Sequence, residues 1–172
     1  MTSHRWLAVR SVRNGRGIVA LRAFARGATV LRIRGRLLHS DALWRAWERD
    51  PRLAANCFRY DQERYLSPRG TVADFANHSC RPNTAIVRVR GGLALRALRR
   101  IERGEEILHD YATLLGADDV WTMRCNCGER GCRKVVRRFD ALPTAVLARY
   151  LRLRAIPRHI LETAPERVRR GR

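Results

Sequence analysis

The sequence predicts a mainly β domain built from short strands, and three observations support this prediction. Several runs alternate apolar and polar residues with a period of two, tight glycine turns separate these runs, and helical spacing is confined to short segments. The 172 residues suffice for one domain, and a content of 45% hydrophobic and 30% charged residues suits a folded chain. Many short strands with tight turns and little helix indicate a β-rich architecture.

We expect a strand wherever a run of alternating apolar and polar residues begins or ends at a turn signal. The turn signals are Asn14-Gly15-Arg16-Gly17, Arg26-Gly27 and Gly91-Gly92. The last is a strong hairpin signal because both glycines accept positive φ. The strands expected from these signals span residues 6–12, 18–24, 29–38, 58–66, 84–89 and 93–98.

Two segments have helical spacing. Ser40 is a suitable N-cap for a short helix that ends near Pro51. Residues 144–154 repeat apolar side chains at helical intervals, and Pro143 precedes them at a position that suits a first turn. We therefore expect a C-terminal helix, followed by frayed basic residues from 165 to 172.

Five cysteines are present, and three of them lie close together. Cys125, Cys127 and Cys132 share a tight loop with two glycines. An odd total with this clustering suits metal binding in a reducing compartment better than a disulfide framework. A structural zinc site takes four ligands, so the loop needs one further cysteine, and only Cys57 and Cys80 remain.

The formal net charge is +20, and Lys134 is the only lysine among the 36 basic residues. Two interpretations stay open, namely a compositional bias toward arginine and a surface that binds nucleic acid or another acidic partner. In either case a protein this basic repels highly basic peptides at low salt, unless its binding groove is locally acidic.

The sequence also indicates where the protein works. No apolar run approaches the length of a membrane span, and the first residues do not resemble a signal peptide. Together with the clustered thiols, this predicts a cytoplasmic protein that has no membrane partner.

Four stretches of the sequence resemble motifs of the SET-domain family of lysine methyltransferases. Two resemble its signature motifs: Asn77-His78-Ser79-Cys80-Arg81-Pro82-Asn83 and Gly104-Glu105-Glu106-Ile107-Leu108-His109-Asp110-Tyr111. The run from Cys125 to Cys132, continued by Arg133-Lys134, is similar to the post-SET motif of trithorax-type enzymes. Asn14-Gly15-Arg16-Gly17 is similar to the N-terminal cofactor loop. The resemblance runs from about residue 6 to 135, with the motifs in family order.

The resemblance implies a SET fold in which a threaded, pseudoknot-like active-site segment brings Asn77 beside Tyr111. It implies a SET domain over residues 1–115, a post-SET zinc-binding motif over 116–136 and a C-terminal helical extension over 137–172. It selects Cys80, Cys125, Cys127 and Cys132 as the zinc ligands. Cys57 is then a buried free thiol.

The resemblance further implies methylation of a lysine side chain on a protein substrate, with S-adenosyl-L-methionine and zinc as cofactors. Such a transfer is an in-line displacement that needs a neutral amine, alignment and exclusion of water. Tyr111 matches the catalytic tyrosine, whose hydroxyl aligns the amine and favours its uncharged form. The positions that match cofactor-binding residues are Asn14, Gly15, Arg16, Gly17, Asn77, His78 and Asn126.

His109 occupies a position next to the lysine channel that is usually phenylalanine or tyrosine in the family. A protonated imidazole there repels the incoming ammonium, so we expect a rate that falls below about pH 6–7. The alternative is that His109 points away and hydrogen-bonds to backbone. Trp121 is expected to pack the zinc loop rather than to form a substrate wall.

Two other functions stay open at this point. One is a non-catalytic SET-like module that binds nucleic acid or proteins through its arginines, although the intact Tyr111 and Asn77-His78 argue against it. The other is a methyltransferase for a small-molecule amine, because the insert between Leu38 and Phe58 leaves little material for a peptide-binding wall.

Overall fold

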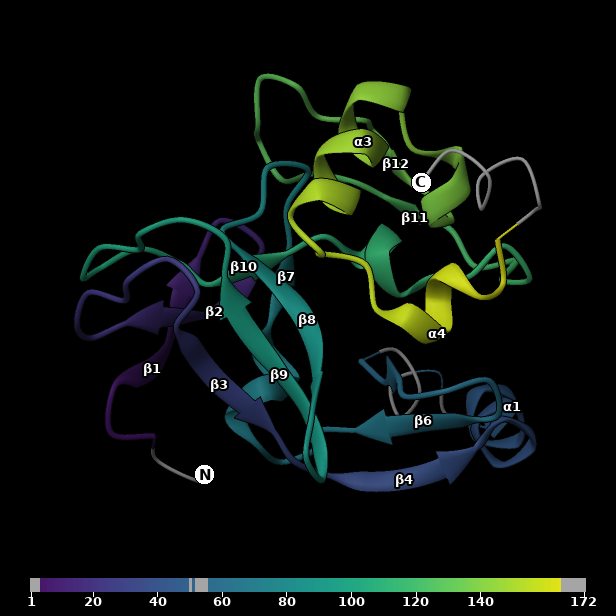
Figure 1. Ribbon diagram of the computed structural model, residues 1–172. Coiled ribbons are helices and arrows are strands. Elements are labelled where there is room, and N and C mark those ends of the chain that lie inside the picture. Colours follow the sequence, from purple (N-terminus) through teal and green to yellow (C-terminus); the bar gives the residue numbers. More distant parts are fainter. Residues whose placement is uncertain (1–3, 50, 52–55, 165–172) are drawn as a thin grey trace.

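The computed structural model describes residues 4–49, 51 and 56–164, and it consists of short strands with few helices (Figure 1). The strands are β1 Leu7–Val12, β2 Gly15–Ala20, β3 Thr29–Ile33, β4 Arg36–His39, β5 Phe58–Arg59, β6 Arg64–Ser67, β7 Asn77–His78, β8 Thr84–Val89, β9 Gly92–Ala97, β10 Leu108–His109, β11 Met123–Arg124 and β12 Val135–Val136. The helices are α1 Ser40–Arg49, α3 Thr144–Arg152 and α4 Arg158–Leu161, and the 3₁₀ turns are η1 Val72–Phe75, η2 Tyr111–Leu114 and η3 Phe139–Ala141. The predicted mainly β fold is confirmed.

The strands form five small sheets in the described part of the chain. Antiparallel pairing joins β1 to β2 and β11 to β12, and it builds the three-stranded sheets β3-β9-β8 and β4-β6-β5. The fifth sheet pairs β7 with β10 in parallel. In Figure 1 the β1–β2 hairpin lies on the left, the β3-β9-β8 sheet at the centre, and β4, β6 and α1 at the lower right.

Two predicted strands have different bounds in the structure. The second strand begins at Gly15 rather than at residue 18, because β2 pairs with β1 directly after a two-residue turn. The strand predicted over 29–38 is divided into β3 and β4 at Gly35. A Cβ atom on Gly35 would lie 1.8 Å from the carbonyl oxygen of Ser67, so this close approach of two backbones requires a glycine.

The strand predicted over 58–66 is a hairpin of β5 and β6. Asp61 makes the turn, since its carboxylate accepts the backbone N–H groups of Glu63 and Arg64 at 3.1 and 2.9 Å. This side-chain turn is the kind that aspartate favours. This turn divides the segment that was predicted as one strand.

Both predicted helices are present, as α1 and α3. The short helix α4 was not predicted, because Pro157 was read only as the end of the preceding helix. Pro157 in fact stands at the N-terminus of α4. A backbone N–H at this position would have no partner within the helix, so proline loses no hydrogen bond there. The predicted fraying of residues 165–172 lies outside the described residues.

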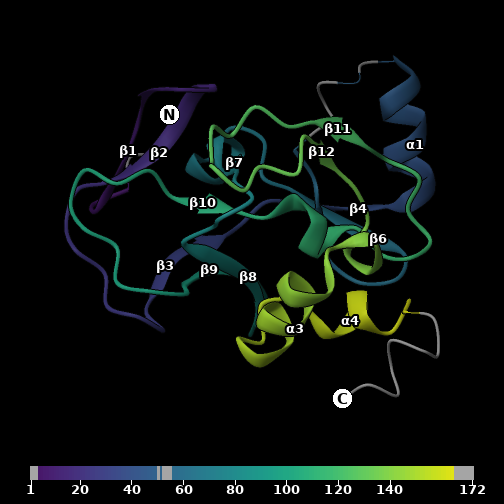
Figure 2. The ribbon, with the colours of Figure 1, turned by 90° about the horizontal axis from the view of Figure 1, so that it is seen from above.

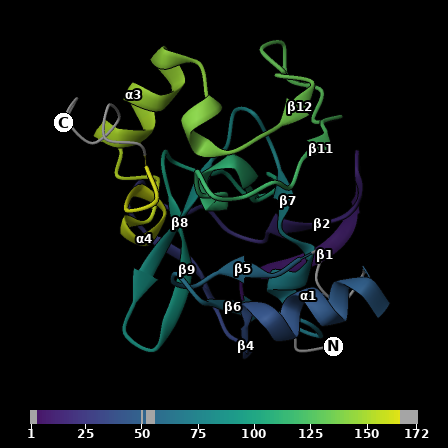
Figure 3. The same cartoon turned by 90° about the vertical axis from the view of Figure 1, so that its right-hand side faces the viewer.

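Two clusters of buried side chains hold these elements together. The first lies between the N-terminal hairpin and the β3-β9-β8 sheet and includes Ile18, Ile33 and Leu95. The second includes Phe139 and Tyr150 and joins the C-terminal helices to the cysteine loop. Figures 2 and 3 show α3 and α4 together beside β8, away from the β1–β2 hairpin.

No helix in the described residues is long and apolar enough to span a membrane. The division into three parts stays a prediction.

Candidate active site and metal centre

The parallel pairing of β7 with β10 brings the two signature stretches together. Asn77 lies opposite Leu108 and His78 opposite His109, and the backbone N–H of Ser79 donates to the carbonyl of His109 at 3.0 Å. The pairing joins segments that are distant in sequence, as the resemblance implies. Asn77 and His78 therefore lie beside the strand that ends at Tyr111.

Tyr111 begins η2 and points its hydroxyl at the backbone next to β7. The hydroxyl donates to the carbonyl of Ala76 at 2.9 Å, and the ring lies 5.3 Å from the His78 ring and 4.8 Å from the His109 ring, between centroids. Burial raises the pKa of Tyr111 to about 12, and the Glu106 carboxylate adds to this effect. Tyr111 therefore keeps its proton at neutral pH and is a hydrogen-bonding group rather than a resting base.

A cavity of about 110 Å³ opens beside Tyr111. Its walls are largely aromatic and apolar, and its charged residues are Arg59, Asp74 and Asp119. The uncharged residues that line it are Leu43, Trp44, Trp47, Asn56, Cys57, Phe58, Tyr65, Ala73, Ala76, His109, Tyr111, Leu114, Leu115 and Trp121. We call this space the tyrosine cavity. It is close in size to the roughly 150 Å³ cavity that holds a benzene molecule, so it suits one slender side chain.

Helix α1 corrects the expectation that the insert leaves little material for a peptide-binding wall. Leu43, Trp44 and Trp47 of this helix line the tyrosine cavity, and Trp44 keeps 49% of its surface exposed. Trp121 lines the same cavity with its ring 6.5 Å from that of Tyr111, and it also packs against the second core cluster. Residues of the insert and of the loop after η2 therefore both line the tyrosine cavity.

His109 lines the tyrosine cavity, but its charge does not change near neutral pH. The residue is 2% exposed, and no described group bonds to its buried Nδ1. Burial, with a smaller contribution from the nearby His78, lowers the pKa of His109 to about 3. A ring that is neutral throughout that range argues against the fall in rate expected below about pH 6–7, and the pH dependence of the rate stays a prediction.

Four of the five cysteines form one cluster. The Sγ atoms of Cys80, Cys125, Cys127 and Cys132 all lie within 4.8 Å of one another, and those of Cys80 and Cys125 are 3.8 Å apart. Zinc–sulfur bonds of about 2.3 Å place the corners of a tetrahedron about 3.8 Å apart. The cluster fits a tetrahedral metal ion. Cys57 stands outside the cluster and lines the tyrosine cavity.

Hydrogen bonds around the thiols complete the fit to a metal site. The backbone N–H groups of Arg133 and Lys134 donate to the sulfurs of Cys80 and Cys132, both at 3.4 Å. Thiolates bound to a metal carry negative charge, and such donors stabilise it. Lys134 has a φ of 65°, which turns the chain back after the cysteine loop.

The cysteine loop contacts the predicted cofactor loop. Asn14 and Asn126 line one concave surface with Cys125 and Cys132. Arg13 donates its Nε to the carbonyl of Asn126 at 3.1 Å. Asn126, which matches a cofactor-binding position, lies between two cysteines of the cluster, and this contact places the two loops together.

Asn77 connects the cofactor loop to the second signature stretch. Its amide donates to the carbonyl of Arg16 at 3.0 Å and to the carboxylate of Glu106 at 2.8 Å. Gly15 has a φ of 90°, and a Cβ on Gly17 would lie 2.3 Å from the Glu106 carboxylate. Both glycines are therefore required by the backbone geometry and by this close packing. The sequence analysis assigned no role to Glu106.

His78 links Tyr111 to the cysteine cluster through its ring. Nδ1 accepts the backbone N–H of Tyr111 at 3.2 Å, and Nε2 lies 3.5 Å from the sulfur of Cys80. Burial lowers the pKa of His78 to about 4, so the ring is neutral and its proton lies on Nε2. The sequence predicted His78 as a cofactor-binding residue, and this role of its side chain was missed.

Asp110 is a further residue that the sequence analysis missed. Its side chain is fully buried and binds both terminal nitrogens of Arg133 at 2.7 Å. The hydroxyl of Tyr150 donates to it at 2.8 Å, and the backbone N–H of Ala112 at 3.1 Å. One carboxylate thus joins the second signature stretch, the segment after Cys132 and helix α3. Its position directly before Tyr111 was the only signal in the sequence.

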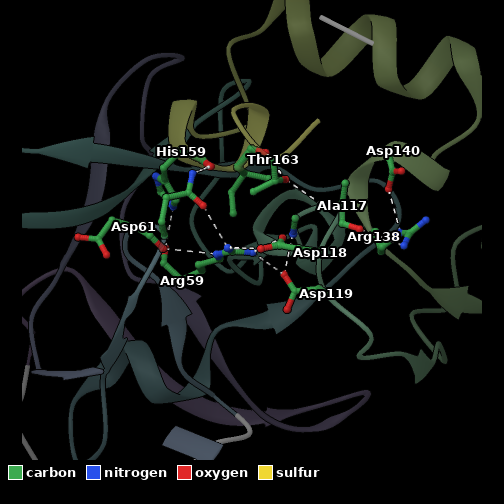
Figure 4. A network of polar contacts seen from close by, with 12 residues as sticks. Arg59, Asp61, Ala117, Asp118, Asp119, Arg138, Asp140, His159 and Thr163 are labelled. Carbon is green, nitrogen blue, oxygen red and sulfur yellow. Dashed lines mark hydrogen bonds and ion pairs between the residues drawn. The ribbon is translucent and has the colours of Figure 1, made fainter. Parts of the chain in front are cut away.

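Arg59 organises the loop that walls the tyrosine cavity (Figure 4). Its guanidinium is 4% exposed and binds Asp118 and Asp119 at 2.7 and 2.9 Å. On the other side, the ring of His159 in α4 lies 3.0 Å from the Arg59 carbonyl, and Gln62 donates to the His159 carbonyl at 2.9 Å. The short helix α4 therefore supports, through Arg59, the loop that lines the tyrosine cavity.

Comparison with known proteins agrees with this fold. A family model described as "SET domain" matches residues 15–112. The chain is 30% identical over 133 residues to histone-lysine N-methyltransferase 2B of Homo sapiens and, over the same length, 30% identical to histone-lysine N-methyltransferase trithorax of Drosophila virilis. It is 39% identical over 82 residues to the H3 lysine-4 specific histone-lysine N-methyltransferase of Emericella nidulans.

The chain belongs to the SET-domain family. The alignments cover 73%, 73% and 44% of this chain, but only 5%, 3% and 7% of these three relatives. The relatives are thus far longer proteins, and what their names describe is considered for this chain below.

Proposed function

We propose that the chain is a protein-lysine N-methyltransferase that uses S-adenosyl-L-methionine. The observation that carries the proposal is the position of Tyr111. Its ring lines the tyrosine cavity, which suits one slender side chain, and its hydroxyl donates to the carbonyl of Ala76, the residue before Asn77. The names of the aligned relatives, all histone-lysine N-methyltransferases, support the same reaction class.

In this proposal the tyrosine cavity binds the substrate lysine. Aromatic walls exclude water from the methylene groups, and Asp74 and Asp119 favour the approach of the ammonium. The amine loses its proton before transfer, because only the neutral amine has a free electron pair. The Tyr111 hydroxyl, protonated at neutral pH, and the Ala76 carbonyl then orient this amine. The neutral His109 leaves the cavity end uncharged.

The cofactor is proposed to lie between the loop around Asn14, the Asn77 amide and Asn126, and it supplies the methyl group on a sulfonium. Gly15 exposes its backbone, and Arg16 brings a positive charge to the same loop. Asn77 and Glu106 keep this loop against β7. Transfer itself needs no covalent intermediate with the protein.

We propose that the four-cysteine cluster binds one zinc ion with a structural role. A closed set of four thiolates leaves no open position for a substrate or water. The ion would fix the loop that carries Asn126 and, through His78 and Arg133, the segment around Tyr111. The gathering of four of the five cysteines into one cluster also supports our proposal of a cytoplasmic location, where thiols stay reduced. Subcellular fractionation tests the location.

The reaction class is tested by incubating the protein with a labelled methyl donor and a cell extract, followed by mass spectrometry of the labelled products. We expect methyl groups on lysine side chains of proteins, and none after Asn77→Ala at low donor concentration. Label only in small amines would replace this proposal with the small-molecule alternative. No label in any fraction, with the donor bound, would favour the non-catalytic alternative.

A further inference from the structure

A second concave surface lies across η1 from the tyrosine cavity. Ala73 lines both, so one turn of helix separates them. We call this surface the arginine cleft. Besides residues of η1, its walls include His4, Trp6, Arg22, Phe24, Arg32 and Arg34.

The two surfaces have opposite charges. Arg59, Asp74 and Asp119 line the tyrosine cavity and give it a net charge of −1, whereas no aspartate or glutamate of the described residues lines the arginine cleft. Among the ion pairs of the described residues, none involves Arg22, Arg32 or Arg34. The three guanidinium groups are exposed, so their charge is uncompensated within the cleft.

Aromatic rings hold part of this charge in place. The guanidinium of Arg22 lies 5.0 Å from the Trp6 ring centroid and 4.8 Å from that of Phe24. Arg5 lies 4.6 Å from the same Trp6 ring. A stacked guanidinium keeps its N–H donors at its edge, where they reach a carboxylate in bidentate geometry.

We propose that the arginine cleft binds an acidic segment of the substrate protein close to the methylated lysine. This inference rests on the proposed function and names its substrate class, a lysine flanked by aspartate or glutamate. A helical turn with its side chains is about 10 Å wide, and an extended chain covers about 3.3 Å per residue. The acidic residues therefore stand about three or four positions from the lysine.

The geometry favours an acidic polypeptide over a nucleic acid. Single-stranded nucleic acids bind through aromatic faces on which bases stack. Arg5 and Arg22 already stack on Trp6, and Phe24 is buried beneath Arg22. The groups that remain open to a ligand are the N–H donors at the edges of the guanidinium groups. Such donors in a concave surface suit separate carboxylates on an extended chain.

Binding of short fluorescent peptides, measured by anisotropy, tests this proposal without any methyl transfer. Each peptide carries one lysine, with aspartates three and four positions away on one side, with asparagines there, or with arginines there. We expect the acidic peptides to bind most tightly and to weaken as salt is added. The Arg22→Gln, Arg32→Gln double variant should lose about threefold to tenfold of that affinity and leave the asparagine peptide unchanged.

A matched double variant, Arg149→Gln with Arg152→Gln on α3, removes the same charge at exposed positions away from the cleft. It should keep at least most of the preference for acidic peptides. Equal losses in both variants would show a general effect of net charge and overturn the proposal. An oligonucleotide that binds through Arg22 and Arg32 while acidic peptides do not would also overturn it. Peptide binding without methylation would instead contradict the proposed function, whereas the proposal that the cleft binds acidic segments would stand.

Discussion

Arg133 and Asp110 form a bidentate ion pair at 2.7 Å that is almost completely buried. The same Arg133 donates its backbone N–H to the sulfur of Cys80, so one residue contacts the metal cluster and the carboxylate next to Tyr111. This pair connects the C-terminal third of the protein to the active-site segment. Removing this ion pair should therefore affect both the C-terminal third and the active-site segment.

Replacing Arg133 with alanine should destabilise the protein by roughly 3–5 kcal/mol, because it leaves the buried Asp110 without its cation. The exposed neighbour Arg137, changed to alanine, is the matched control and should shift stability by less than about 0.5 kcal/mol. Denaturant unfolding of both variants measures the difference. Similar midpoints for the two would mean that the pair contributes little.

Cys80→Ser should lower the zinc content of the purified protein from one ion per chain, whereas Cys57→Ser should leave it unchanged. The reason is that Cys80 lies in the four-sulfur cluster and Cys57 outside it. Elemental analysis, together with circular dichroism of each variant, gives the answer. Loss of zinc in the Cys57 variant alone would contradict the ligand assignment.

The low pKa of His109 predicts how stability depends on pH. The unfolded chain binds a proton on this residue near pH 6.5, whereas the folded protein does so only near pH 3. Stability from neutral His109 is therefore complete above about pH 6.5 and is lost as the pH falls toward 3. His109→Phe should lose less stability over this range than the parent does, measured by denaturant unfolding at each pH. Parallel pH profiles of stability would show that His109 titrates normally in the fold.

The same residue predicts the pH dependence of the reaction. Because His109 is neutral from pH 6 to 9, the rate over this range should follow deprotonation of the substrate lysine alone. The parent and His109→Phe should then share the shape of their rate profiles, although the number of methyl groups added can differ. A pH dependence between 6 and 7 that is lost in His109→Phe would restore the charge switch expected from the sequence.

Local patterns in the sequence predicted much of the fold and three of the four clustered cysteines, whereas Cys80 was selected by the resemblance to the family. The glycine pair at residues 91–92, the alternation in β8 and β9, and the cysteine spacing all reflect short-range geometry. The ion pair of Asp110 and the support of Arg59 by His159 were missed, because they join segments far apart in the chain.

The charge state of His109 was also beyond the sequence. Its pKa depends on how completely β5, β10 and η2 enclose the ring, which no local pattern encodes. The role of α1 as a cavity wall was missed for a similar reason. Its amphipathic pattern predicts a helix, but not what its tryptophans face.

In the proposed reaction the Tyr111 hydroxyl orients the amine during methyl transfer, and single-turnover kinetics of Tyr111→Phe measures this role. The phenylalanine keeps the buried ring, so the fold and the affinity for S-adenosyl-L-methionine, measured by calorimetry, should stay near those of the parent. The rate of transfer should fall about 10²–10⁴-fold, the usual value of a positioned hydrogen-bonding group. Transfer at the parent rate by a folded, donor-bound Tyr111→Phe protein would contradict the claim and leave the tyrosine with a packing role.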